Sequence, residues 1–245
     1  MSAVALASPA APVTSFQLEA DEAHCWLVSL DAPPKVSARL HATLSADERA
    51  RGERFHFERD RRRFVIARGA LREILARYLW TNPGEIEFVY NEYGKPDLAG
   101  EYAGRVGFNL SHSNDLALIG IGNCGDIGVD VEYIRVEPDF AAIAQRFFSS
   151  AEVECLSAVP SDRYAEAFFG IWTKKEAYIK ARGEGLSIPL NRFSVPPAIE
   201  PGQTCVDIEG RPWSLSTLRP APGYIAALAM EGASRRLRPW QWNTR

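Results

Sequence analysis

The chain has 245 residues, of which 46% are hydrophobic and 24% are charged, a composition typical of globular proteins. Its formal net charge of −3 argues against a general nucleic-acid-binding protein, because such proteins are usually basic overall. The length allows one large domain or two small ones, with enough apolar residues to bury a hydrophobic core.

The N-terminal stretch "MSAVALASPAAPVTS" carries no early positive charge and is interrupted by two prolines. This pattern predicts a loose tail over residues 1–15 rather than a signal peptide. No apolar run approaches the length of about 20 residues that a membrane-spanning helix needs. The cysteines are far apart and lack a CxxC pair, which argues against a zinc site and favours free thiols in a reducing compartment: Cys25, Cys124, Cys155 and Cys205. We therefore expect a cytoplasmic protein that binds neither nucleic acid nor a membrane.

Alternation and helical periodicity divide the first half into strands around one long helix. After the tail, "HCWLVSL" alternates like a strand. Residues 45–79 predict one helix, because apolar side chains recur every three or four residues and Ser45 with Glu48 forms a capping-box pattern. The remaining elements are a strand and turn at 85–98, two strands joined by "SHSND" at 105–122, and a strand that closes this half at 126–134.

The second half repeats this arrangement. Residues 139–159 are helical by periodicity, "FFGIWTKKEAYIKARGEGLSIPL" at residues 168–190 reads as an amphipathic helix, and short strands follow at 204–210, 212–220 and 223–230. Because both halves carry a long helix followed by strands, we predict an α+β fold of two similar lobes related by a pseudo-twofold axis. The predicted N-terminal lobe covers residues 16–136 and the C-terminal lobe covers residues 137–245. A ligand site is expected between them, because interfaces commonly provide clefts.

Two carboxylates share one face of the strand "GVDVEYI". The strand period of two turns Asp130 and Glu132 to the same side, opposite Val129 and Val131, with the two acidic Cα atoms roughly 6.6 Å apart. Both carboxylates can therefore reach one cation, and Mg²⁺ prefers oxygen ligands of this kind. The alternative is a solvated strand face, although like charges repel there and acidic residues are depleted in strands.

The helix at residues 168–190 supplies a third carboxylate and two lysines. Glu176 either completes a Mg²⁺ site with the strand carboxylates or forms a surface pair with Lys180, worth only about 0.3–0.5 kcal/mol. Lys175 falls inside the apolar stripe of this helix. Its side chain either extends out of the stripe along its stem or, together with Lys180, meets phosphate oxygens beside the carboxylates.

Two further motifs are candidates for phosphate contacts. In "YGKPDL", Gly94 and Pro96 form a tight turn that presents Lys95, although the P-loop pattern is absent. Ser111 and His112 lie at a strand end and form either a structural corner or a site for a phosphate monoester. Ser111 lacks the GxSxG elbow of a hydrolase nucleophile.

The arginine-rich segment between Arg49 and Arg77 is mostly expected to form a solvated helix face. Arg51 and Arg63 are the members that we expect to reach a phosphate. The other arginines offer a basic surface to an acidic protein partner, where charge would steer the encounter.

The motifs "EYGKP", "FNLSHS", "GVDVE" and, about 40 residues later, "FFGIWTKKEAYIKARGEGL" follow one another along the chain. In this order and spacing the chain resembles the Sfp-type 4′-phosphopantetheinyl transferases from about residue 25 to about residue 230. The resemblance implies a monomer that binds coenzyme A and Mg²⁺ in the cleft between two lobes. It also implies transfer of the 4′-phosphopantetheine arm to a serine of an apo acyl- or peptidyl-carrier protein, with release of 3′,5′-ADP.

The site residues implied by the resemblance follow motif by motif. The metal-site acids correspond to Asp130, Glu132 and Glu176, and the catalytic lysines near the pyrophosphate to Lys175 and Lys180. The contacts to coenzyme A correspond to these two lysines and to Arg51, Arg63, Lys95, Pro96, Ser111 and His112. Glu176 is the first choice for the general base, acting as base, metal ligand or both. The alternative is a non-catalytic carrier- or nucleotide-binding protein of the same fold.

Overall fold

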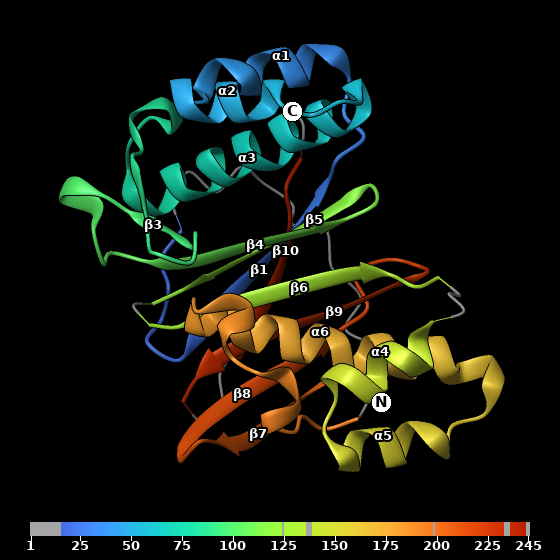
Figure 1. Cartoon of the computed structure of the whole chain (residues 1–245). Coiled ribbons are helices and arrows are strands. Elements are labelled where there is room, and N and C mark those ends of the chain that lie inside the picture. Colours follow the sequence, from blue (N-terminus) through green and yellow to red (C-terminus); the bar gives the residue numbers. More distant parts are fainter. Residues whose placement is uncertain (1–15, 124, 136–138, 198, 233–235, 244–245) are drawn as a thin grey trace.

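The computed structural model describes residues 16–123, 125–135, 139–197, 199–232 and 236–243, and Figure 1 shows its helices and strands. The tail predicted over residues 1–15 lies outside the described residues. The fold is α+β, as predicted, with groups of helices and strands alternating along the chain.

The described elements follow in chain order, with the strands and α-helices labelled as in Figure 1. The first group comprises β1 (Glu22–Ser29), α1 (Pro34–Thr43), α2 (Ala46–Glu53), α3 (Glu58–Leu79), β2 (Phe88–Tyr90), β3 (Pro96–Leu98), β4 (Gly107–Ser113) and β5 (Leu116–Gly122). The second group comprises β6 (Ile127–Tyr133), α4 (Phe140–Phe147), α5 (Ser150–Ser157), α6 (Tyr164–Arg182), β7 (Gly202–Ile208), β8 (Arg211–Leu218), β9 (Tyr224–Glu231) and β10 (Arg236–Gln241). Short 3₁₀ turns lie at Pro83–Glu85, Gly100–Tyr102, Ser161–Arg163, Gly185–Ser187 and Leu190–Arg192.

Two four-stranded sheets pack between two layers of helices. The first sheet has the order β10-β1-β5-β4 and the second has the order β6-β9-β8-β7, while β2 and β3 form a separate hairpin. Helices α1, α2 and α3 lie over the first sheet, and α4, α5 and α6 lie on the side of the second sheet (Figure 1). The two sheets therefore meet in the middle of the molecule.

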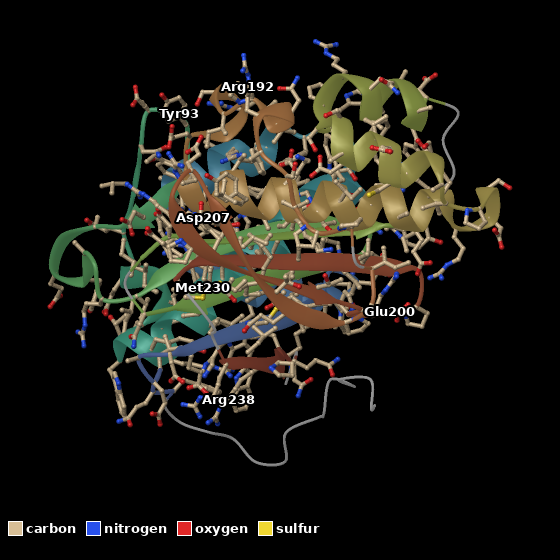
Figure 2. The ribbon with its side chains drawn as sticks, turned by 90° about the horizontal axis from the view of Figure 1, so that it is seen from below. Tyr93, Arg192, Glu200, Asp207, Met230 and Arg238 are labelled. Atoms are coloured by element: carbon tan, nitrogen blue, oxygen red, sulfur yellow. The ribbon has the colours of Figure 1, made fainter. Side chains whose placement is uncertain are left out.

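Strand alternation builds three hydrophobic cores from these layers. On β1, Trp26 and Val28 belong to the core under α1 and α3, whereas Cys25 and Leu27 belong to the core between the sheets. Met230 of β9, labelled in Figure 2, belongs to the same middle core. A third core joins α6 to the outer face of the second sheet. Both sheets are thus buried on two faces, which accounts for the nearly continuous apolar runs in their central strands.

The sheets divide the chain differently from the predicted boundary at residues 136 and 137. β6 pairs antiparallel with β9 in the second sheet, and β10 pairs parallel with β1 in the first sheet. Alternation within a strand shows which face is apolar but carries no information about which distant strand is its hydrogen-bonding partner. The expectation that residues 126–134 close the first half therefore fails, because this strand opens the second sheet.

The two halves share an order of elements. Each begins with a strand, continues through helices, and then forms an antiparallel pair (β4 with β5, β8 with β9), so that β1-β5-β4 in one sheet corresponds to β6-β9-β8 in the other; β10 follows the second pair and joins the first sheet. This shared order is what the predicted duplication requires. The rotation axis that would relate the halves stays a prediction.

Two long predicted helices are each interrupted in the structure. The segment 45–79 forms α2 and α3 with a break after Glu53, and the segment 139–159 forms α4 and α5 with a break after Phe147. Helical periodicity persists across such breaks, so it does not reveal them. The expected capping box of Ser45 and Glu48 is present and begins α2, and a second capping box at Ser149 begins α5.

Gly128 of β6 lies where α6 crosses the strand. A Cβ atom at this position would lie 2.0 Å from the carbonyl oxygen of Ala177 and 2.4 Å from the amide nitrogen of Ala181. Because helix backbone cannot yield as a flexible side chain can, Gly128→Ala is expected to lower the free energy of unfolding by at least about 1–3 kcal/mol. Urea unfolding measures the loss, with Gly202→Ala as control, since a Cβ there meets nothing within 4 Å. Equal stabilities would contradict the close approach of α6 to β6.

Candidate functional site

The candidate site lies where the two sheets meet, beside β4, β6 and α6 (Figure 1). β4 and β6 are edge strands of their sheets. Val129 and Val131 of β6 point into the core between the sheets, so the strand period turns Asp130 and Glu132 toward α6. On α6, Glu176 and Lys180 are one helical turn apart and share a face.

Asp130 is the most deeply buried acid of this group, with 3% of its surface exposed. Its Oδ1 accepts hydrogen bonds from the Ser111 hydroxyl at 2.9 Å and from the Lys180 ammonium at 2.6 Å, and Lys180 also contacts Ser111 at 3.1 Å. Burial raises the pKa of Asp130, and the positive charge of Lys180 opposes this rise. Burial alone would lower the pKa of Lys180, but the Asp130 carboxylate reverses that effect and raises it. Asp130 and the partly exposed Lys180 therefore form an ion pair at the centre of the site.

The other two acids are half-buried beside this pair. Burial raises the pKa of Glu176 to about 7, Lys180 counteracts this effect, and the negative charges of Asp130 and Glu132 add to it. Burial and the charge of Asp130 likewise raise the pKa of Glu132, whose Oε2 accepts a hydrogen bond from the Ser113 hydroxyl at 2.8 Å. The structure therefore brings the three predicted metal-site acids so close together that the negative charge of one raises the pKa of another.

The donor set suits a divalent cation such as Mg²⁺. Asp130 Oδ2 is buried and has no hydrogen-bond partner, which is costly for a carboxylate oxygen. A cation would satisfy this oxygen and relieve the repulsion among the three acids. Among the described residues, no group of three or more His, Cys, Asp and Glu side chains has the spacing to hold a metal ion as placed. The positive charge that contacts Asp130 in this structure is the Lys180 ammonium.

Positive charge surrounds His112 at the end of β4. His112 follows Ser111 on β4. Its pKa is lowered by partial desolvation of the ring and by the positive charges of Lys180, Arg63 and Arg51. Arg63 also donates to the side chain of Asn114 at 3.4 Å. Ser111 contacts Lys180, and the charges of Lys180, Arg51 and Arg63 all act on His112, so these predicted phosphate contacts could receive an anion together.

Lys95 and Pro96 lie apart from this group, in a cleft of about 410 Å³ between the β2–β3 hairpin, β4 and the end of α6. The Lys95 ammonium donates to the carbonyl oxygen of Ala181, and burial lowers its pKa. Asn91 of the same turn donates to the carbonyl oxygen of Gly183 at 2.8 Å. The turn therefore caps the C-terminal end of α6, in addition to lining the cleft.

The structure corrects the expectation for Lys175. Its side chain is fully buried on the far side of α6, where the ammonium pairs with Glu152 at 2.8 Å and donates to the carbonyl oxygens of Leu190 and Phe193 at 2.7 Å each. All three N–H donors are engaged, so neither a phosphate nor solvent is needed to satisfy them. The lysine inside the apolar stripe is explained by a buried partner that lies 23 residues earlier in the chain.

Three residues that support the elements around the site were not singled out from the sequence. Ser113 holds Glu132, Asn109 of β4 accepts the backbone N–H of Val129 at 3.0 Å, and Glu152 binds Lys175. The alternation of Asn109, Ser111 and Ser113 in "NLSHS" is a signal that all three face the neighbouring strand. The capping-box spacing from Ser149 marks Glu152, but nothing in the sequence links it to Lys175.

Comparison with known proteins decides the family. The family model described as "4'-phosphopantetheinyl transferase, N-terminal" matches residues 33–122, and the one described as "4'-phosphopantetheinyl transferase superfamily" matches residues 126–229. The 4'-phosphopantetheinyl transferase HetI of Nostoc sp. (strain PCC 7120 / SAG 25.82 / UTEX 2576) is 40% identical over 229 residues, which cover 93% of this chain and 95% of that protein. The chain belongs to the 4′-phosphopantetheinyl transferase superfamily.

Two further relatives support its assignment as an Sfp-type transferase. The 4'-phosphopantetheinyl transferase Sfp of Bacillus subtilis (strain 168) is 31% identical over 208 residues, covering 82% of this chain and 89% of that protein. The 4'-phosphopantetheinyl transferase ffp of Bacillus subtilis is 34% identical over 195 residues, covering 78% and 83%. The second family match starts at residue 126, just before β6, which agrees with the sheets rather than with a boundary after residue 136. Among the described helices of this transferase, none has both the length and the apolar character needed to cross a membrane.

The raised pKa of Glu176 makes the stability of the transferase depend on pH. The folded carboxyl binds its proton more tightly than the unfolded one, so stability falls as pH rises from about 4.5 to about 7. The rise from 4.5 to about 7 corresponds to about 3 kcal/mol. We expect urea unfolding in EDTA to show this loss, and added Mg²⁺ to reverse it at neutral pH. The same measurement on Glu176→Gln gives the pH dependence of all other groups. If the difference between the two free energies of unfolding increased from pH 4.5 to about pH 7, the raised pKa of Glu176 would be contradicted.

Proposed function

We propose that this enzyme transfers the 4′-phosphopantetheine arm of coenzyme A to a serine of an apo acyl- or peptidyl-carrier protein and releases 3′,5′-ADP. The proposal includes a Mg²⁺-dependent reaction, a monomeric enzyme and a cytoplasmic location. The observation that carries it is Glu176, a half-buried acid with a pKa of about 7 beside two further acids and a lysine. A general base works best when its pKa lies near the operating pH.

In the proposed reaction, the serine oxygen of the carrier attacks the β-phosphorus of coenzyme A. The new bond joins this oxygen to phosphorus, and the bond from phosphorus to the bridging oxygen of the pyrophosphate breaks. The bridging oxygen keeps the electron pair and leaves as part of 3′,5′-ADP. Glu176 accepts the serine proton as the bond forms, and it releases this proton to solvent afterwards.

Other residues of the site bind and orient the two substrates. Asp130, Glu132 and Glu176 are the residues that would hold Mg²⁺, which supplies positive charge to the pyrophosphate when bound. Lys180 adds a fixed positive charge beside the reacting phosphate, because Asp130 and Ser111 hold its ammonium in place.

The remaining contacts would hold the nucleotide. Arg63, Arg51 and Lys180 supply positive charge around His112, and this group suits the phosphates of the leaving nucleotide. Lys95 and Pro96 line the cleft that would receive the adenine end. Lys175 has no proposed contact with substrate, because its ammonium is bound to Glu152 and two backbone carbonyls.

The test is a mass measurement on the carrier. The enzyme is incubated with coenzyme A, Mg²⁺ and an apo acyl-carrier protein, and the intact carrier is weighed. We expect a gain equal to one phosphopantetheine arm, which is lost when the acceptor serine is replaced by alanine or when EDTA is present. Consumption of coenzyme A without a gain in carrier mass would identify a phosphohydrolase instead. An unchanged carrier with intact coenzyme A would identify a binding protein.

A further inference from the structure

β4 and β6 are neighbours that do not pair through their backbones. Each is the edge strand of its own sheet, and an edge strand presents unpaired N–H and C=O groups. Side chains at alternate positions of β4 accept the free N–H groups at alternate positions of β6. The three pairs are Asn109 with Val129 at 3.0 Å, Ser111 with Val131 at 3.4 Å, and Ser113 with Tyr133 at 3.1 Å.

Two of these three side chains make a second contact. The Ser111 hydroxyl donates to Asp130 at 2.9 Å, and the Ser113 hydroxyl donates to Glu132 at 2.8 Å. A hydroxyl has one donor and two acceptor positions, so each serine can accept from a backbone N–H and donate to a carboxylate at once. In both cases the carboxylate belongs to the residue just before the donating N–H. The two serines therefore repeat one arrangement, two residues apart on each strand.

Asn109 extends the same ladder without the second contact. Its side chain accepts the N–H of Val129, and the residue before Val129 is Gly128, which has no carboxylate to receive a donor. Asn109 thus joins the two strands and does nothing for the acids. This difference separates the role of joining the sheets from the role of holding the carboxylates.

We propose that Ser113 is a positioning residue that orients Glu132 for the metal ion, as Ser111 orients Asp130. The inference rests on the proposed function, since it assigns a role within the metal-binding group of acids. Glu132 needs such a partner because its side chain has three rotatable bonds and Asp130 repels it. With Oε2 held by Ser113, the carboxylate stays on the α6 side of β6, next to Asp130 and Glu176.

The experiment compares metal binding in Ser113→Ala with binding in the wild-type chain. Mn²⁺ serves as the probe, since carboxylate sites suited to Mg²⁺ also accept it, and its binding in the presence of coenzyme A is followed by electron paramagnetic resonance. Removing a group that orients a metal ligand typically costs about 10- to 100-fold in affinity, and we expect a loss of this size. Ser113→Thr, which keeps the hydroxyl, is expected to bind Mn²⁺ as the wild type does.

Asn109→Ala is the matched control. It removes a ladder bond to the fully buried Val129, whereas Ser113→Ala frees the N–H of Tyr133, a residue exposed to water. The control is therefore expected to reduce thermal stability more than Ser113→Ala does, while leaving Mn²⁺ affinity at the wild-type value. Wild-type affinity in Ser113→Ala, or an equal loss of affinity in Asn109→Ala, would overturn the proposal.

A second measurement covers the case in which Ser113→Ala does not fold well enough for titration. In a Glu132→Gln background, Ser113→Thr and Ser113→Val are compared, and we expect no difference in Mn²⁺ affinity because the oriented carboxylate is gone. A difference between Ser113→Thr and Ser113→Val only when Glu132 is present supports the assignment, and equal affinities in both backgrounds overturn it. If the wild-type chain itself binds no Mn²⁺, the proposed function fails along with the inference. If the wild-type chain binds Mn²⁺ but the Ser113 variants bind it equally well, the inference about Ser113 fails and the proposed function stands.

Discussion

Replacing Glu176 by glutamine is expected to reduce phosphopantetheinyl transfer by about 10²- to 10⁴-fold, the range that a general base contributes. Glutamine keeps the size of the side chain and its one carbonyl oxygen, but it cannot take a proton from the attacking serine. The pKa of about 7 means that the wild-type carboxyl is basic enough to accept this proton, while about half of the molecules carry it deprotonated near neutral pH. The loss should therefore appear in the rate of the chemical step rather than in the binding of coenzyme A.

The rate is measured as carrier converted per minute at saturating coenzyme A, with intact-mass detection, and coenzyme A affinity is measured separately by calorimetry. Glu154→Gln is the control, because Glu154 is an exposed acid on α5, away from the site. Titration with Mn²⁺ then separates the two roles of Glu176. Unchanged Mn²⁺ affinity identifies a base alone, and a reduced affinity identifies a metal ligand. A rate close to that of the wild type would remove Glu176 from catalysis.

The sequence predicts which face of a strand or helix a side chain lies on, wherever that face follows from local periodicity. The period of two in β6 places Asp130 and Glu132 on one face, and the hairpin of β4 and β5 forms around the polar corner at Asn114 and Asp115. The capping box at Ser45 is likewise a contact between residues three apart. In each case the atoms involved are neighbours in the chain, so spacing alone determines their geometry.

The partners of these elements could not be predicted in the same way. β6 pairs with β9 and β10 pairs with β1, and both pairings join segments that are about 90 to 215 residues apart. The pattern of a strand does not identify its partner, so the predicted division between lobes placed β6 with the wrong sheet. For the same reason the sequence predicts Ser111 as a phosphate contact and does not reveal its hydrogen bond to Asp130, which lies on β6 across the junction of the sheets.

Lys175 shows the same limit on the scale of one side chain. Its position in an apolar stripe is visible in the sequence and signals that the ammonium must have a special partner. A phosphate and a buried carboxylate both satisfy that requirement. Only the packing of α5 against α6 selects Glu152, which also accepts the backbone N–H of Val195 at 2.7 Å. The next residue, Glu176, points toward β6, so adjacent residues on opposite sides of α6 belong to a structural ion pair and to the proposed site.

Replacing Lys175 by methionine is expected to lower the free energy of unfolding by about 3–5 kcal/mol, the cost of breaking a buried ion pair by removing one partner. Methionine fills a similar volume, but it leaves the Glu152 carboxylate buried without its counter-ion and leaves the carbonyl oxygens of Leu190 and Phe193 without a donor. Urea unfolding measures the loss. Lys35→Met is the control, because Lys35 is exposed and its removal changes the net charge by the same amount.

Adding Glu152→Gln to Lys175→Met should recover part of the lost stability, because the uncompensated charge is then removed, although the single amide oxygen can accept only one of the N–H groups of Ser149 and Val195, which bind different oxygens of Glu152. Coenzyme A affinity, measured at a temperature where Lys175→Met is fully folded, decides between the two roles of this lysine. Unchanged affinity with reduced stability is the result of a lysine that holds α6 in place against α5. Normal stability with weakened coenzyme A binding would instead return Lys175 to the phosphate site and contradict its burial beside Glu152.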